Sequence, residues 1–147
     1  MQKKLLIKFI LLILILSQTV NTHAQNPVNW TEKQLMEPSV LADIIKNKPG
    51  DITIISVGPF STIPGTINIG MVSEKDKLDE FKAALSTLKK DKQVVIYCGC
   101  CPFEKCPNVR PAIDVLKEMH FTNYYLLNLP NNLRINWMDK GYPTIKL

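Results

Sequence analysis

The chain has 147 residues, of which 46% are hydrophobic and 21% are charged, and its formal net charge is +5. This length is typical of one domain, and the apolar fraction excludes an intrinsically disordered protein. The first 24 residues contain three lysines and no acidic residue, so the other 123 residues carry a net charge of only +2. A nucleic-acid partner is therefore not expected, because binding to backbone phosphates needs a concentrated basic surface.

Residues 1–24 have the three parts of a secretory signal peptide. Lysines come first, an apolar stretch follows over residues 9–16, and small residues precede a cleavage site after Ala24. The apolar stretch is shorter than the roughly 20 residues that a membrane-spanning helix needs. We therefore expect an exported protein of a bacterial periplasm, with no stable membrane insertion once the signal peptide is removed.

The rest of the chain alternates between helical and extended patterns. Residues 25–37 are expected to lead into a domain that covers residues 38–147. The expected elements, in chain order, are a helix after Pro38 that ends before Asn47, a strand at 52–57, a short strand around Ile67 and Ile69, an amphipathic helix through Leu78 and Leu88, a strand at 93–97, a helix capped by Asn108, a strand at 124–127 and a short helix within 131–140. Strands that alternate with helices predict an α/β fold with a parallel central sheet of about four or five strands and helices on both faces.

All four cysteines lie within nine residues, and we call them the cysteine cluster: Cys98, Cys100, Cys101 and Cys106. They are too close together to form a disulfide framework that closes long loops, so they belong to one local site. In an oxidising compartment such thiols are expected to be redox-active, metal-bound or paired in disulfides. Phe103 and Glu104, between the cysteines, are expected at an exposed loop tip.

Cys98 directly follows the strand at 93–97, and the next helix begins on the same side of the sheet. Ligands of parallel α/β sheets bind beyond the carboxyl ends of the strands. The helix N-terminus and the nearby Arg110 are expected to lower the pKa of a thiol there. This arrangement predicts a thiolate nucleophile that handles an anionic substrate or a persulfide.

Histidine has little part in the expected chemistry. Once the leader is removed, only His120 remains, near the end of the helix that follows Asn108. One histidine does not support a His-rich metal site. We expect His120 to be stabilised by the helix dipole at the C-terminal end of the helix rather than to act in catalysis.

Several segments, in the correct order over roughly residues 38–145, resemble the rhodanese-like domain of the sulfurtransferase family. Residues 63–69 are similar to the family's GHIPGAINI segment, 94–98 to the strand that carries the catalytic cysteine, 121–127 to GFxNVYxL, and 137–143 to the closing WxxxGYP. The resemblance implies a rhodanese-like fold, with Cys98 as the nucleophile and Arg110 as the arginine at the loop end. It also implies a persulfide on Cys98, formed from a small sulfur-donor anion and passed to a thiol acceptor, which can be a protein, without a cofactor.

The chain departs from the family pattern around this site. Ser56-Val57-Gly58 stands in place of the family's Asp-x-Arg, and Ser61-Thr62 in place of Gly-His. The usual CxxGxRS loop is replaced by a longer, cysteine-rich segment over residues 98–110, and residues 130–132 replace a Gly-Gly pair. We therefore expect an atypical, extended active-site loop.

The additional cysteines leave three kinds of chemistry open. Cys100, Cys101 and Cys106 are candidate resolving or redox thiols, and Cys101 or Cys106 can attack a Cys98 persulfide, release sulfide and leave a disulfide. Cys98 and Cys101 also form a CxxC, which favours a periplasmic thiol–disulfide redox protein as an alternative. The third interpretation is a Cu(I) or zinc site made by the whole cysteine cluster. Copper fits more easily than zinc, because adjacent Cys100 and Cys101 suit a tetrahedron poorly.

Overall fold

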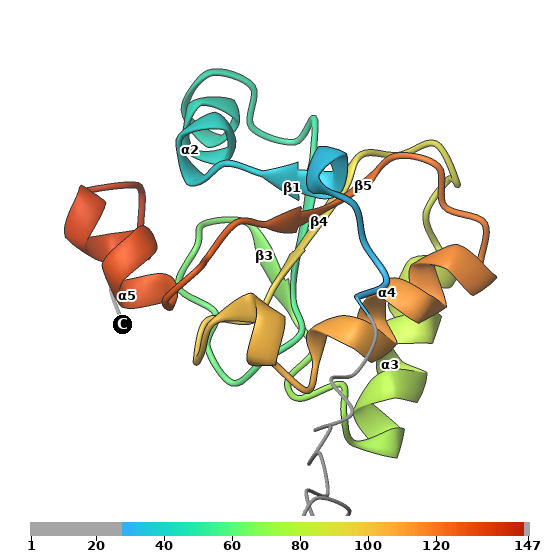
Figure 1. The fold of residues 1–147 in the computed structure, drawn as a ribbon. Coiled ribbons are helices and arrows are strands. Elements are labelled where there is room, and N and C mark those ends of the chain that lie inside the picture. The colour runs from blue at the N-terminus through green and yellow to red at the C-terminus, as the bar shows by residue number, and fades with distance from the viewer. Residues whose placement is uncertain (1–27, 146–147) are drawn as a thin grey trace, which may run out of the picture.

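The computed structural model describes residues 28–145, and the expected signal peptide lies outside them. The strands form one five-stranded sheet: β1 (Leu35–Met36), β2 (Thr53–Ser56), β3 (Thr66–Asn68), β4 (Val94–Tyr97) and β5 (Tyr124–Leu127). Their order across the sheet is β1-β5-β4-β2-β3, and every neighbouring pair is parallel (Figure 1). The predicted parallel sheet is confirmed, and β4 is its central strand.

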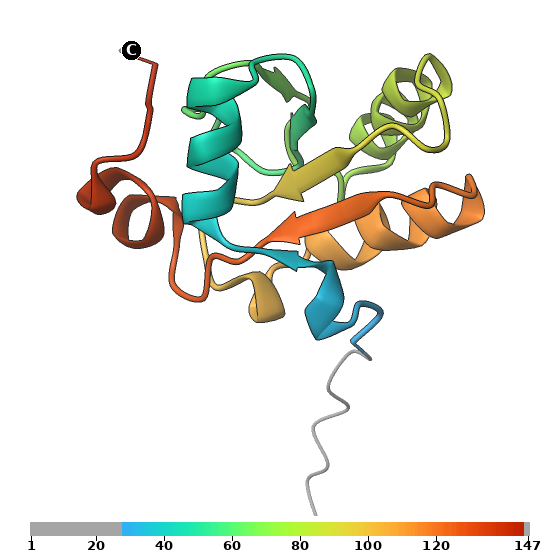
Figure 2. The same ribbon diagram turned by 90° about the horizontal axis from the view of Figure 1, so that it is seen from above.

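Helices cover both faces of the sheet, as predicted. They are α2 (Pro38–Asn47), α3 (Lys75–Ser86), α4 (Val109–Glu118) and α5 (Leu133–Asn136), with 3-10 turns η1 (Glu32–Gln34), η2 (Phe103–Lys105) and η3 (Met138–Lys140). Figures 1 and 2 show α3 and α4 side by side, with α2 and α5 together on the other side of the sheet. Within residues 28–145, no helix combines the length and the apolar character that crossing a membrane requires.

The pleat of β4 divides its side chains between two hydrophobic cores. Val94 and Ile96 pack into the core under α3 and α4, whereas Val95 and Tyr97 pack into the core under α2 and α5. Successive side chains of a strand point to opposite faces. Cys98 continues this alternation and belongs to the α3–α4 core. The strand register therefore decides on which face the first thiol of the cysteine cluster lies.

The segment before residue 38 contributes to the sheet. Leu35 and Met36 form the edge strand β1, which pairs with Leu126 and Leu127 of β5. The sequence indicated no strand here, because two residues are too few to show an alternating pattern. The expected lead-in segment over residues 25–37 thus includes one strand of the sheet.

His120 follows the end of α4 in a backbone conformation that favours glycine. Its φ is 60°, the only positive φ among the non-glycine residues of 28–145. The His120 N–H donates to the Lys117 carbonyl and the Phe121 N–H to the Leu116 carbonyl, which is the hydrogen-bond pattern of a Schellman motif. The GFxNVYxL segment that residues 121–127 resemble has glycine at the position of His120.

Replacing His120 with glycine should stabilise the fold. The left-handed conformation costs an L-residue roughly 1–2 kcal/mol, whereas glycine adopts it without this cost. Glycine also increases the entropy of the unfolded chain, which offsets part of the stabilisation. We expect His120→Gly to raise the free energy of unfolding by roughly 0.5–1 kcal/mol, measured by urea denaturation. Met119→Gly, at a position with negative φ, is the matched control and should destabilise. A lower urea midpoint for His120→Gly would contradict the strain that we assign to this position.

Candidate active site

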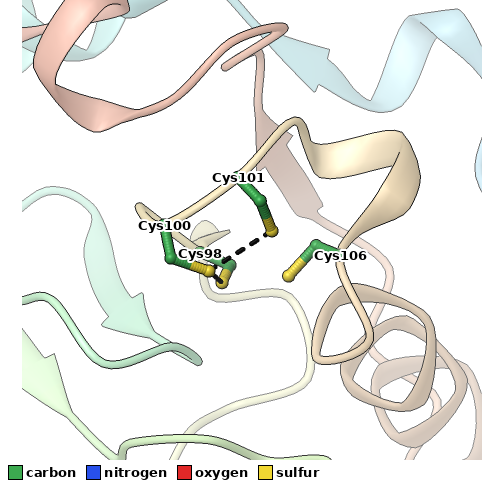
Figure 3. Close-up of side chains that lie close together, drawn as sticks. All are labelled: Cys98, Cys100, Cys101 and Cys106. Carbon is green, nitrogen blue, oxygen red and sulfur yellow. Dashed lines mark hydrogen bonds between the residues drawn. The ribbon is translucent and has the colours of Figure 1, made fainter.

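The loop that joins β4 to α4, residues 98–108, brings all four thiols of the cysteine cluster together. Their sulfur atoms all lie within 4.8 Å of one another (Figure 3). Cys98 Sγ is 3.4 Å from Cys100 Sγ, which is 3.3 Å from Cys101 Sγ, and all four residues are free thiols. Cys98 and Cys106 are buried, Cys101 is half-buried and Cys100 is exposed. The four thiols thus differ in exposure, from Cys100 at the surface to Cys98, which is buried at the end of β4.

Asn108 links this cluster to the loop before α3. It stands at the N-cap position of α4, as predicted, but its side chain makes no capping hydrogen bond. Its Nδ2 instead donates to Cys98 Sγ at 3.6 Å, and its Oδ1 accepts from the Ser73 backbone N–H at 3.0 Å. Asn108 is 2% exposed. Its contact with Cys98 was not apparent from the sequence, because asparagine before a helix is already explained by capping.

The electrostatics of the cluster differ from the sequence-based expectation. The neighbouring Cys106 thiol, together with burial, raises the pKa of Cys98. The proximity of Cys98 in turn lowers the pKa of Cys106. The expected lowering at Cys98 is wrong because the neighbouring Cys106 thiol and burial outweigh the donors around the Cys98 sulfur. Within the cluster, it is the pKa of Cys106 that is lowered.

The two other thiols keep their protons more firmly than a free cysteine does. Burial raises the pKa of Cys100. Burial also raises the pKa of Cys101 to about 11, and the neighbouring Cys100 thiol adds to this increase. Removal of a thiol from water disfavours its charged form. The negative charge of the reduced cluster is therefore favoured at Cys106.

Gly58 packs directly against the first cysteine. A Cβ atom at Gly58 would lie 2.4 Å from Cys98 Sγ and 3.2 Å from Cys98 Cα. The Ser56 hydroxyl shapes this turn by donating to the Phe60 carbonyl at 2.6 Å. The family's Asp-x-Arg is thus replaced by a serine that holds the turn and a glycine that makes room for the Cys98 sulfur. The role of Gly58 was missed, because one glycine after a strand usually marks only a turn.

Arg110 and Trp30, which lies in the segment before β1, contact the part of the loop around Phe103 and Glu104. The Arg110 guanidinium donates to the Glu104 carbonyl at 2.6 Å and lies 5.5 Å from the centre of the Trp30 ring. Trp30 also packs edge-on against Phe103, which is buried rather than at an exposed loop tip as expected, whereas Glu104 is exposed. Contact between Arg110 and an anionic substrate stays a prediction.

Helix α5 contacts the beginning of the same loop, at Gly99. The Leu133 N–H, at the start of α5, donates to the Gly99 carbonyl at 3.0 Å. A Cβ atom at Gly99 would lie 2.9 Å from Leu133 Cβ. The Asn132 side chain caps α5 by accepting from the Ile135 N–H at 2.9 Å. Residues 130–132, which replace the family's Gly-Gly, therefore lead into a helix that presses on the backbone next to Cys98.

Gly58→Ala should destabilise the protein by forcing the Cys98 sulfur out of its place. Overpacking of a filled core typically costs about 1–3 kcal/mol. We expect a loss of that size in the wild-type background and a smaller loss in a Cys98→Ala background, because the closest clashing atom is then absent. A double-mutant cycle of unfolding free energies measures this difference. Equal losses of unfolding free energy in the two backgrounds would show that the Cys98 sulfur does not oppose the methyl group added at position 58.

Comparisons with known proteins identify the fold. No protein-family model matches the sequence, and no curated protein matches it either. A rhodanese-like domain from an Anabaena species is 20% identical with a TM-score of 0.54, covering 78% of this chain and 80% of that one. A single-domain sulfurtransferase from Saccharomyces cerevisiae is 18% identical with a TM-score of 0.53, covering 76% and 95%. A Bacillus halodurans protein is 19% identical with a TM-score of 0.56, covering 75% and 74%. The chain therefore has a rhodanese-like α/β fold, with an atypical cysteine-rich loop after its central strand.

Proposed function

We propose that this is an exported, periplasmic sulfur-transfer protein in which Cys98 accepts a sulfane sulfur from a small anion and carries it as a persulfide. A rhodanese-like fold and a cysteine cluster fit sulfur transfer. The observation that supports the proposal most is the position of Cys98. It follows the central strand β4 and has three further thiols within 4.8 Å of its sulfur.

The first step is attack by the Cys98 thiolate on the outer sulfur of the donor. Cys98 gives its proton to solvent before the attack; with thiosulfate, the S–S bond of the donor then breaks and sulfite leaves with the bonding electron pair. Because the Gly58 backbone fills one side of the Cys98 sulfur, the transferred sulfur is expected on the side of exposed Cys100. In this proposal Arg110 keeps the loop in place through Glu104 and Trp30.

The second step is resolution of the persulfide by a neighbouring thiol. A thiolate of the cluster attacks Cys98 Sγ, the bond to the outer sulfur breaks, hydrosulfide leaves, and a disulfide forms. Two equivalents of an external thiol, or one external dithiol, then reduce this disulfide and are themselves oxidised to a disulfide. Direct transfer is the other branch: the acceptor thiol attacks the outer sulfur and takes it, which returns Cys98 as a thiolate. The short distances between the sulfurs support the first branch.

Intact-protein mass spectrometry after treatment with thiosulfate or polysulfide tests the proposal. The expected product in a variant with Cys100, Cys101 and Cys106 all changed to serine is an added sulfur atom that persists, because no thiol of the chain remains to resolve it. The wild-type protein should instead release hydrosulfide and lose two free thiols. Cys98→Ser is the matched control and should retain no added sulfur. An equal adduct in Cys98→Ser, or no adduct with either donor in the triple variant, would refute the proposal.

A further inference from the structure

The same thiols have the arrangement of a ligand set. We propose that the cysteine cluster is a four-thiolate binding site for one thiophilic d10 metal ion, Zn²⁺ or Cu⁺. This proposal concerns binding and does not depend on the sulfur-transfer reaction. It rests on the positions of the four sulfur atoms, which form the only metal-ligating group of this kind found within residues 28–145.

The distances between the sulfurs suit a single ion. A Zn–S bond length of about 2.3 Å makes the sulfur–sulfur edge of a tetrahedron about 3.8 Å. Two separations in the cluster, 3.3 and 3.4 Å, and its upper limit of 4.8 Å lie on either side of that edge. A small adjustment of side-chain rotamers therefore gives tetrahedral coordination. A cluster of several irons would hold its thiolates farther apart.

Cys100 and Cys101 are adjacent in the chain and were expected to suit one tetrahedron poorly, but their sulfur atoms lie close together. The backbone bends at both residues, just before Pro102, and this bend accompanies the 3.3 Å separation of their sulfurs. Figure 3 shows the Cys101 side chain pointing from the loop toward the sulfurs of Cys98 and Cys106. The sequence-based objection to a site that uses both residues therefore does not apply to this conformation.

The surroundings of the cluster suit thiolate ligands. The buried Asn108 side-chain amide donates to the Cys98 sulfur at 3.6 Å. The N-terminus of α4 follows at Val109. Donors and a helix N-terminus offset the net negative charge of an ion held by four thiolates. Soft sulfur ligands select Cu⁺ and Zn²⁺ over ions that prefer oxygen.

Metal coordination would make the Cys98 sulfur unavailable as a nucleophile without any change in its oxidation state. When Zn²⁺ binds, each coordinating thiol gives its proton to solvent and forms one metal–sulfur bond. The Cys98 sulfur is then held by the ion and is not free to attack a sulfur donor. Metal binding and persulfide formation at Cys98 are therefore expected to exclude each other.

Metal titration of the reduced protein under anaerobic conditions tests the site. Zn²⁺ is titrated in competition with a chromophoric zinc chelator, and Cu⁺ with a Cu⁺-specific chelator. We expect one equivalent to bind, and Co²⁺ used as a spectroscopic probe should give sulfur-to-cobalt charge-transfer bands and the intense d–d bands of a tetrahedral thiolate site. The two titrations also show which ion the site prefers.

Cys100→Ser and Cys101→Ser are the informative variants, since these residues are not fully buried and the core is left intact. Each should weaken binding by more than the roughly 10- to 100-fold typical of mutating a residue that only supports a metal ligand. His120→Gly removes the one histidine of residues 28–145 and should leave the affinity unchanged. Absence of 1:1 binding for both Zn²⁺ and Cu⁺, or unchanged affinity in both cysteine variants, would overturn the proposal.

Failure of this proposal is separable from failure of the sulfur-transfer proposal. The mass-spectrometric test is run on protein freed of metal by a chelator, so it does not require the metal site. The metal-loaded protein is then treated with the same sulfur donor and should form the Cys98 adduct at least about 10-fold more slowly, a difference of roughly 1.4 kcal/mol. An equal rate would show that Cys98 is not a ligand and would overturn the four-thiolate site.

Discussion

The parallel pairing of β4 between β2 and β5 is the constraint on which the site depends. It fixes the direction of every side chain along the central strand and places Cys98 at the end of that strand, on the face covered by α3 and α4. The same pairing brings the turn after β2 next to β4, so that Gly58 meets the Cys98 sulfur. Only the first thiol of the cluster is positioned by the sheet. The three others depend on the loop.

The loop is therefore held by segments from the two ends of the described chain. Trp30 packs against Phe103 on its outer side, and Leu133 of α5 hydrogen-bonds to Gly99 on its inner side. Asn108 connects its last turn to the segment before α3. A long loop without such contacts would lose its conformation to chain entropy. These contacts keep the long loop after β4 ordered and bring its four sulfurs together.

The sequence predicted the fold well, because periodic apolar residues and the ordered motifs both indicate alternating strands and helices. The spacing of the four cysteines also predicted that they form one local cluster after β4, and their sulfurs do lie together there. It missed β1, which is too short to show periodicity, and the burial of Phe103, which depends on a ring more than 70 positions away. The predicted direction of the Cys98 pKa shift was wrong because that shift depends on burial and on the neighbouring Cys106 thiol, and spacing along the chain does not reveal distances in a folded loop.

The attachment of the N-terminal segment has a consequence for how the molecule opens. Asn29 donates to the Arg110 carbonyl and to Asp114, and the Lys117 ammonium donates to the Asn29 carbonyl, so these contacts join residues more than 80 positions apart. Contacts of such high sequence separation form late in folding, because closing a long loop is entropically costly. They are also made by few, partly exposed groups, which places them among the regions that open locally before the core does. Exposure of the buried Cys106 thiol is thus expected to follow undocking of this segment, at a free-energy cost below that of global unfolding.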